Sequence, residues 1–161
     1  MSDISGGDCM KYNKVIFVCE DNTCQSPAAA AIMKSINRSE ELEIESRGLV
    51  VLFAEPYNPK AASLLRTKGI ILENGETAQL GVKDFGDDVL ILALNKTVKG
   101  KLQDGFGDVP NVYTVTEFAG GNGEDIPDPY GADMETYVNF CNILEKWVRR
   151  AEDRLYAINI Q

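Results

Sequence analysis

The sequence predicts a single α/β domain of three layers (α/β/α), with helices on both faces of a four-stranded parallel sheet. Short apolar runs alternate along the chain with segments of helical periodicity, and strands that are joined by helices pair in parallel. The length of 161 residues suits one domain. Hydrophobic residues make up 44% of the chain and charged residues 25%, which excludes disordered, collagen-like and disulfide-scaffold proteins.

The first half of the domain is expected to hold two strands and two helices. A β-branched apolar run at 14–18 predicts a buried strand, and alternation at 42–46 predicts a second one. A serine-proline pair and the alanines after it predict a helix over 26–36, with the serine as N-cap and the proline at the first helical position. An asparagine-proline pair predicts a second helix over 58–68, which Gly69 ends.

The second half of the domain repeats this alternation. An apolar run at 89–94 predicts a buried third strand, followed by a helix over 96–103 and a fourth strand over 112–115. The last helix is predicted over 133–155, because its apolar positions recur at helical spacing. These positions are Met134, Tyr137, Val138, Cys141, Leu144, Val148, Ala151 and Leu155.

The N-terminus and the cysteine content indicate where the protein works. Residues 1–13 are polar and predict a flexible leader, so the single domain is expected to span 14–161. The leader lacks the apolar stretch of a signal peptide, and no apolar run approaches the ~18 residues of a transmembrane helix. Four cysteines are too few for a disulfide framework and favour a reducing compartment. We therefore expect a cytoplasmic protein.

The charged residues and the missing histidines exclude several function classes. The chain has 25 Asp and Glu against 16 Lys and Arg, a formal net charge of −9. Such an acidic chain is a poor partner for nucleic acid or for an anionic membrane. Because it contains no histidine, Ser-His-Asp catalysis, Cys-His catalysis and histidine-ligated metal sites are excluded.

The polar segment between the first strand and the first helix is the expected anion site. Residues 19–25 can form a tight loop whose backbone N–H groups point inward, and the N-terminus of the following helix adds about half a positive charge. Cys19, at the end of the strand, would lie beneath a bound anion. The same field is expected to lower the pKa of its thiol and to favour the nucleophilic thiolate.

Two motifs resemble the low-molecular-weight protein tyrosine phosphatase family. Residues 18–27 read V-C-E-D-N-T-C-Q-S-P, where the family has V-C-x-G-N-x-C-R-S-P between strand and helix. Asp128-Pro129-Tyr130, shortly before the last helix, is similar to the family's D-P-Y/F loop, which carries a general acid. The resemblance covers residues 14–157 and implies a phosphomonoester hydrolase that uses no metal and no other cofactor.

The same resemblance implies a role for individual residues. Cys19 is the implied nucleophile that attacks phosphorus, and Asp128 the acid that protonates the leaving group and then activates water. Asn22 and Ser26 are implied to hold the loop and stabilise the thiolate, and Cys24 to protect the nucleophile by forming a disulfide. The implied phosphate-binding loop consists of Glu20, Asp21, Asn22, Thr23, Cys24, Gln25 and Ser26. The implied partners are phosphorylated proteins, with phosphotyrosine as the main substrate class, or small phosphoesters.

Two loop residues depart from the family pattern, and two carboxylates stand in the loop. Gln25 replaces the arginine whose charged fork binds the phosphoryl oxygens. Analogous arginines contribute ~10³–10⁵ in rate, so impaired activity is expected. Asp21 replaces a glycine, and it strains the turn if that position needs a positive φ. If Glu20 and Asp21 point inward, they repel phosphate and raise the pKa of Cys19; if they point outward, the backbone cradle survives.

These departures leave three alternatives open. A catalytically inactive homologue that binds a ligand or a protein partner fits Gln25 and the acidic loop. A protein-arginine phosphatase fits Thr23, because family members that hydrolyse phosphoarginine resemble this chain in having threonine there, where tyrosine-specific members often have a larger aliphatic residue. A thiol redox protein that uses Cys19 and Cys24 would be similar to the arsenate reductases that share the fold.

Overall fold

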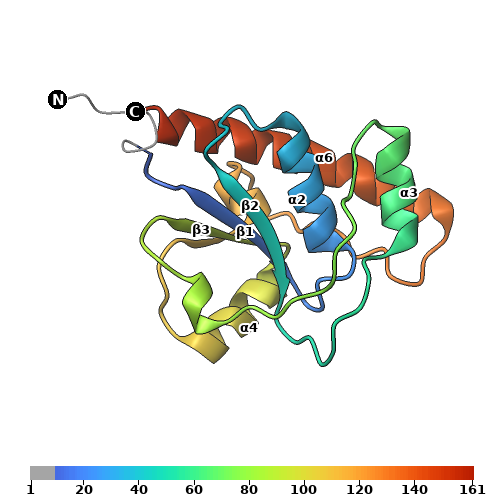
Figure 1. Ribbon diagram of the computed structural model, residues 1–161, viewed down its shortest axis with the longest axis horizontal. Coiled ribbons are helices and arrows are strands. Elements are labelled where there is room, and N and C mark those ends of the chain that lie inside the picture. Colours follow the sequence, from blue (N-terminus) through green and yellow to red (C-terminus); the bar gives the residue numbers. More distant parts are fainter. Residues whose placement is uncertain (1–9) are drawn as a thin grey trace.

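The computed structural model describes residues 10–161 and contains one four-stranded parallel sheet (Figure 1). Its strands are β1 (Lys14–Cys19), β2 (Glu43–Gly48), β3 (Val89–Ala93) and β4 (Val112–Thr114). They lie in the order β2-β1-β3-β4, and Lys14 is in register with Glu43 on one side and with Val89 on the other. The prediction of a four-stranded parallel sheet is confirmed.

Helices cover both faces of this sheet. One face carries α2 (Gln25–Ile36), α3 (Pro59–Thr67), α5 (Val115–Phe118) and α6 (Met134–Asn159). The other face carries α4 (Lys96–Phe106) and the 3-10 turn η1 (Val82–Asp84). The long helix α6 packs against α2, α3 and α5 (Figure 1). The predicted three-layer architecture is therefore confirmed.

Alternation along β1 divides the core into two parts. Val15 and Phe17 pack into the larger part, with α2 and α6, whereas Ile16 and Val18 pack into the smaller part, with α4. All four side chains are fully buried, as expected for a central strand that is covered on both faces. Cys19 continues the alternation toward α2, so its sulfur lies beneath the start of that helix.

The start of α2 differs from the prediction. The helix begins at Gln25, Cys24 takes the N-cap position, and no side chain caps the helix. Ser26 lies in the first turn, and its hydroxyl contacts Cys19 instead of a helix N–H group. The prediction of Ser26 as N-cap is wrong, because a tertiary contact takes its hydroxyl. Asn58 does cap α3 as predicted, since its side chain accepts two backbone N–H groups.

The N-terminal boundary of the domain also differs from the prediction. Residues 10–13 were expected in the leader, but Met10 and Tyr12 pack into the core and Asn13 bonds to Asp88. Tyr12 is buried, its N–H donates to the Asn159 side chain at 3.0 Å, and its carbonyl accepts from the same amide at 2.9 Å. Residues 1–9 of the predicted leader lie outside the described residues.

The remaining differences concern short elements and α6. The sequence did not predict α5 and η1, because four and three residues are too few to show a periodicity. On α6, Met134 and Val138 are exposed, whereas the other predicted apolar positions are buried. Within residues 10–161, no helix combines the length and the apolar content needed to cross a membrane.

Candidate active site

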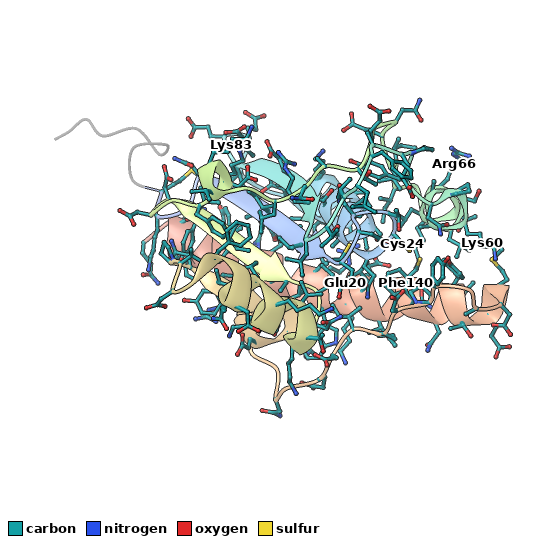
Figure 2. All side chains as sticks on the ribbon, turned by 90° about the horizontal axis from the view of Figure 1, so that it is seen from below. Glu20, Cys24, Lys60, Arg66, Lys83 and Phe140 are labelled. Atoms are coloured by element: carbon teal, nitrogen blue, oxygen red, sulfur yellow. The ribbon has the colours of Figure 1, made fainter. Side chains whose placement is uncertain are left out.

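The loop between β1 and α2 lies at the carboxyl end of the central strands. Its neighbours β2 and β3 flank β1 on opposite sides, and α/β proteins form their ligand crevice at such a point. Figure 2 shows Glu20 and Cys24 at this end of the sheet. The loop residue with a left-handed backbone is Asn22, with φ of 65°, and not Asp21. The replacement of glycine by Asp21 therefore causes no such strain, since asparagine tolerates this conformation.

The thiol of Cys19 is buried at the base of the loop, with 1% of the residue exposed. Its Sγ lies 2.9 Å from the Ser26 hydroxyl and accepts the N–H of Asn22 at 3.3 Å. Burial raises the pKa of the Cys19 thiol, the two hydrogen bonds oppose that rise, and the Asp21 carboxylate adds to it. The prediction of a lowered pKa is thus wrong, because desolvation outweighs the hydrogen bonds.

Asn22 fixes the shape of the loop through its buried side-chain amide. Its Nδ2 group donates to the hydroxyls of Ser26 and Ser46, each at 2.9 Å, and its Oδ1 accepts the N–H of Ala78, also at 2.9 Å. One side chain thereby joins the loop, β2 and the segment between α3 and η1, to which Ala78 belongs. The family resemblance implied a loop-holding role for Asn22 and Ser26, but sequence reasoning missed Ser46 and Ala78.

Gly48, at the end of β2, is a second residue that sequence reasoning missed. A Cβ atom there would lie 2.8 Å from the carbonyl carbon of Asp21 and 2.9 Å from the nitrogen of Asn22. Both are backbone atoms of the loop, so only glycine allows β2 to come this close. The sequence carries one weak signal, which is a glycine directly after an alternating strand.

The two acidic loop residues behave differently. Glu20 points away from the loop and pairs with Lys101 of α4, with 2.8 Å between the charged atoms. The Oδ1 of Asp21 accepts the backbone N–H of Thr23 at 3.1 Å and its hydroxyl at 2.8 Å. Glu20 therefore leaves the cradle free, whereas Asp21 takes one of its backbone donors.

Gln25 brings the second motif to the loop. Only 6% of this residue is exposed, and its Nε2 donates to the carbonyl of Pro127 at 3.2 Å. The next residue, Asp128, has an exposed side chain, and its Oδ1 accepts the N–H of Tyr130 at 3.0 Å. The structure thus brings together the two motifs, although about a hundred residues separate them.

Cys24, in the first motif, is a buried thiol within electrostatic range of Asp128 in the second. Burial raises its pKa to about 12, and the negative charges of Asp128 and Cys19 add to the rise. The three cysteines of the described part of the chain, Cys19, Cys24 and Cys141, are free thiols. Cys141, on the buried face of α6, also has its pKa raised by burial. Cys24 is therefore a protonated thiol at neutral pH.

A shallow depression adjoins the loop on the β2 side. It has a volume of ≈ 190 Å³ and includes Asp21, Phe53 and Thr77 in its lining. Leu52 and Phe53 rise beside it with 87% and 72% of their surface exposed. These apolar side chains offer a contact surface for a group that extends from an anion held in the loop.

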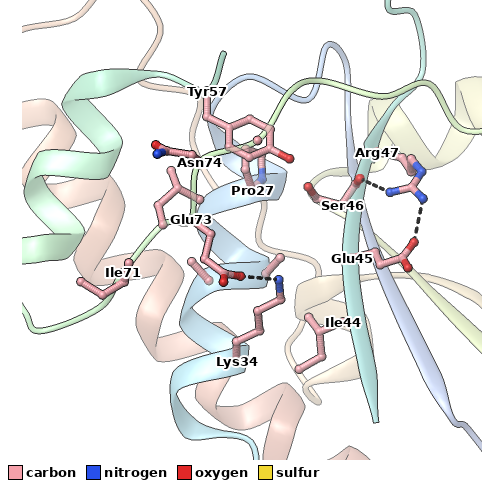
Figure 3. A pocket seen from close by; sticks show the side chains of 14 residues that line it. Pro27, Lys34, Ile44, Glu45, Ser46, Arg47, Tyr57, Ile71, Glu73 and Asn74 are labelled. Atoms are coloured by element: carbon pink, nitrogen blue, oxygen red, sulfur yellow. Dashed lines mark hydrogen bonds and ion pairs between the residues drawn. The ribbon is translucent and has the colours of Figure 1, made fainter. Parts of the chain in front are cut away.

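A second depression lies behind the loop between α2 and β2 (Figure 3). Its charged side chains are paired with each other: Arg47 with Glu45 at 2.7 Å, and Lys34 with Glu73 at 3.4 Å. They therefore do not form an open anion site. Among residues 10–161, no three or more Cys, Asp or Glu side chains gather to hold a metal ion.

Comparisons with known proteins agree with the geometry. A family model described as low molecular weight phosphotyrosine protein phosphatase matches residues 14–157. The chain is 33% identical over 145 residues to a protein-arginine-phosphatase of Bacillus subtilis, which covers 88% of this chain and 95% of that relative. It is 32% identical over 124 residues to the low molecular weight protein-tyrosine-phosphatase PtpB of Staphylococcus haemolyticus, which covers 77% and 86% of the two chains.

Solved structures give the same result. The YwlE arginine phosphatase from Geobacillus stearothermophilus superposes with a TM-score of 0.81 at 27% identity, over 90% of this chain and 94% of the other. A low molecular weight protein tyrosine phosphatase from T. tengcongensis superposes with a TM-score of 0.76 at 28% identity, over 85% and 95%.

Proposed function

Because the chain belongs to the low molecular weight phosphotyrosine protein phosphatase family, we propose that its loop 19–26 hydrolyses phosphomonoesters through a cysteinyl-phosphate intermediate. The observation that carries this proposal is the position of Cys19. Its sulfur lies at the end of a central strand, and the Ser26 hydroxyl and the Asn22 N–H both face it. A sulfur held this way suits a nucleophile that attacks from the base of an anion site.

The proposed reaction has two steps. The Cys19 thiolate attacks phosphorus, so that an S–P bond forms, the P–O bond to the leaving group breaks, and Asp128 gives its proton to the leaving oxygen. Asp128 then takes a proton from water as that water attacks phosphorus, and the S–P bond breaks to release phosphate and thiolate. The Ser26 hydroxyl accepts from Asn22, and its own proton lies within reach of two acceptors, the Cys19 sulfur at 2.9 Å and the Arg47 carbonyl at 3.3 Å. Once Cys19 is a thiolate, its negative charge makes it the stronger acceptor.

We propose that this activity is weak. Gln25 offers no charge to the phosphoryl group, and the raised pKa of Cys19 keeps its thiol protonated at neutral pH. Turnover of an activated aryl phosphate should therefore increase as the pH rises above neutral, where more Cys19 becomes thiolate.

The decisive experiment tests the covalent intermediate. Wild type, Cys19→Ser and Asp128→Asn are mixed with an activated aryl phosphate, quenched in acid and analysed as intact proteins by mass spectrometry. A phosphoryl adduct should form on wild type, persist longer on Asp128→Asn and be absent from the thiol position in Cys19→Ser. If wild type forms no adduct and shows no Cys19-dependent turnover, the enzyme proposal fails and the ligand-binding alternative takes its place.

A phosphoarginine substrate is the second candidate, and Thr23 favours it. The relative from Bacillus subtilis is a protein-arginine-phosphatase, and the guanidinium leaving group of phosphoarginine is cationic. The carboxylates of Asp21 and Asp128 lie around the loop and would attract such a cation. Matched peptides that carry phosphoarginine or phosphotyrosine at one position measure the preference. Thr23→Ile should shift that preference toward phosphotyrosine.

We also propose phosphorylated proteins as partners in the cytoplasm, and neither nucleic acid nor membrane. A thiol nucleophile has to stay reduced, which the cytoplasm ensures. The formal net charge of −9 repels nucleic acid and anionic lipid. Fractionation of cells with an antibody against the native chain tests the compartment.

A further inference from the structure

Gln25 connects the phosphate loop to the segment that carries the proposed general acid. It is the first residue of α2, and its side chain is almost completely buried. The amide Nε2 donates to the backbone carbonyl of Pro127 at 3.2 Å. This carbonyl directly precedes Asp128, so the bond acts one residue away from the carboxyl group.

The segment 127–132 is held by packing and by few hydrogen bonds. Ile126 before it and Pro129 within it are buried, and inside it the N–H of Tyr130 donates to Asp128 and the N–H of Ala132 to Pro129. Within residues 10–161, the bond from Gln25 is the one hydrogen bond that joins 127–132 to another part of the chain. The backbone on either side of Asp128 is therefore held in two ways, by the packing of Pro129 and by the hydrogen bond from Gln25 to the Pro127 carbonyl.

The electrostatics of the site agree with this arrangement. The Asp128 carboxylate contributes to the raised pKa of Cys24, which is the residue directly before Gln25. The acidic side chain thus faces the same end of α2 to which its backbone is tied. The side chain of Asp128 is exposed, so its carboxyl group is accessible to a bound substrate.

We propose that Gln25 is a positioning residue that holds Asp128 in place for proton transfer to the leaving group. This inference rests on the proposed phosphatase function. In the first step the proton moves from the Asp128 carboxyl to the leaving oxygen as the P–O bond breaks, and this transfer requires hydrogen-bond distance. In this proposal Gln25, which stands where the family has its phosphate-binding arginine, positions the general acid Asp128 instead of binding phosphate.

The experiment uses Gln25→Met, which keeps the length and neutrality of the side chain but removes the N–H donor. Esters with a poor leaving group (phenyl phosphate) and a good one (a nitrophenyl phosphate) are compared in single turnovers. The single-turnover rate with phenyl phosphate should fall about 10-fold or more, since general acids contribute ~10²–10⁴ in rate. The nitrophenyl ester should change less than about 3-fold, because its leaving group needs little protonation.

A double-mutant cycle with Asp128→Asn identifies the route of the effect. If Gln25 acts through Asp128, Gln25→Met should have no further effect on phenyl phosphate once Asp128→Asn is present. Equal losses for both esters, persisting with Asp128→Asn, would instead make Gln25 a phosphate ligand and overturn the proposal. Gln79→Met is the matched control, because Gln79 bridges to Val51 on the other side of the site. It should leave the leaving-group dependence unchanged.

A measurement without substrate separates this inference from the proposed function. Hydrogen exchange of the amides in 127–132 should accelerate about 10-fold or more in Gln25→Met. Loss of one hydrogen bond lowers the free energy of local opening, and exchange proceeds from the open state. Unchanged exchange would contradict the anchoring role even in an active enzyme. Accelerated exchange in a protein without Cys19-dependent turnover would support the anchor and refute the phosphatase function.

Discussion

The two neighbouring carboxylates of the loop between β1 and α2 differ in what they contact. Glu20 is paired with Lys101 outside the cradle, whereas Asp21 takes the N–H of Thr23 and raises the pKa of the Cys19 thiol. These contacts could not be predicted from the sequence, because adjacent residues in a loop can point in either direction. Because the two carboxylates are adjacent but only one contacts the loop backbone, mutation of Glu20 is a control for mutation of Asp21.

Removing the charge of Asp21 should activate the loop. In Asp21→Asn the side chain keeps an oxygen that can accept the Thr23 N–H, but the charge near the Cys19 sulfur is lost. The pH-rate profile should shift toward lower pH, and inorganic phosphate should inhibit about 3- to 10-fold more strongly, as expected for one fewer like charge. Glu20→Gln, the control, should change neither quantity. Equal effects of both variants would indicate a general effect of net charge.

Gln25→Arg tests the missing charge itself. A guanidinium group has enough N–H donors to keep the bond to the Pro127 carbonyl and also to contact a phosphoryl oxygen. We expect turnover of an activated aryl phosphate to rise at least ~100-fold, because the transferring group gains a charged, two-pronged donor. Steady-state kinetics measure the change. If turnover does not rise, the charge of Asp21 or the raised pKa of Cys19 limits the activity instead.

At the scale of helices and strands, periodicity predicted most elements but not their functional contacts. The strands and the caps of α3 are local features, so Asn58 could be assigned from its neighbours. Ser26 has the same local signature, yet its hydroxyl contacts Cys19. The bond between Gln25 and Pro127 crosses most of the chain, and no spacing in the sequence indicates it.

The approach of β2 to the loop provides a test at this scale. Gly48→Ala should place a methyl group against two backbone atoms of the loop and destabilise the protein by about 1–3 kcal/mol. Urea unfolding measures this loss. Gly100→Ala, in α4, is the control: nothing lies within 4 Å of the added Cβ, and alanine should stabilise that helix by up to about 1 kcal/mol. If Gly48→Ala leaves the free energy of unfolding unchanged, the backbone of the loop can move to make room for the added methyl group.

For the whole molecule, the order of the strands explains why the candidate site lies at the loop after β1. The chain places β2 on one side of β1 and β3 on the other, so the loop after β1 lies where the connections diverge. The alternation of strands and helices predicted the parallel sheet, whereas the order of its strands comes from tertiary packing. Two independent motifs can meet at this point because every strand ends at the same edge.

Stability of the whole molecule should depend on the buried thiol of Cys24. Its pKa is raised from 9.0 to about 12 on folding, so the folded state keeps a proton that the unfolded chain loses. The contribution is fully present below about pH 9 and decreases above it, by up to about 1.4 kcal/mol per pH unit. Urea unfolding at about pH 8 and about pH 10.5 should show a smaller loss in Cys24→Ala than in wild type. Identical losses would exclude a buried thiol as the cause.

The amide of Asn22 has a thermodynamic consequence for ligand binding. Since its donors and its acceptor are already bonded to Ser26, Ser46 and Ala78, the loop has its final shape before any anion arrives. An oxyanion such as vanadate should then bind without the entropy loss of ordering a flexible chain, and calorimetry should record only a small change in heat capacity. In Asn22→Ala the same titration should acquire that ordering entropy, which makes preorganisation of this site a measurable quantity.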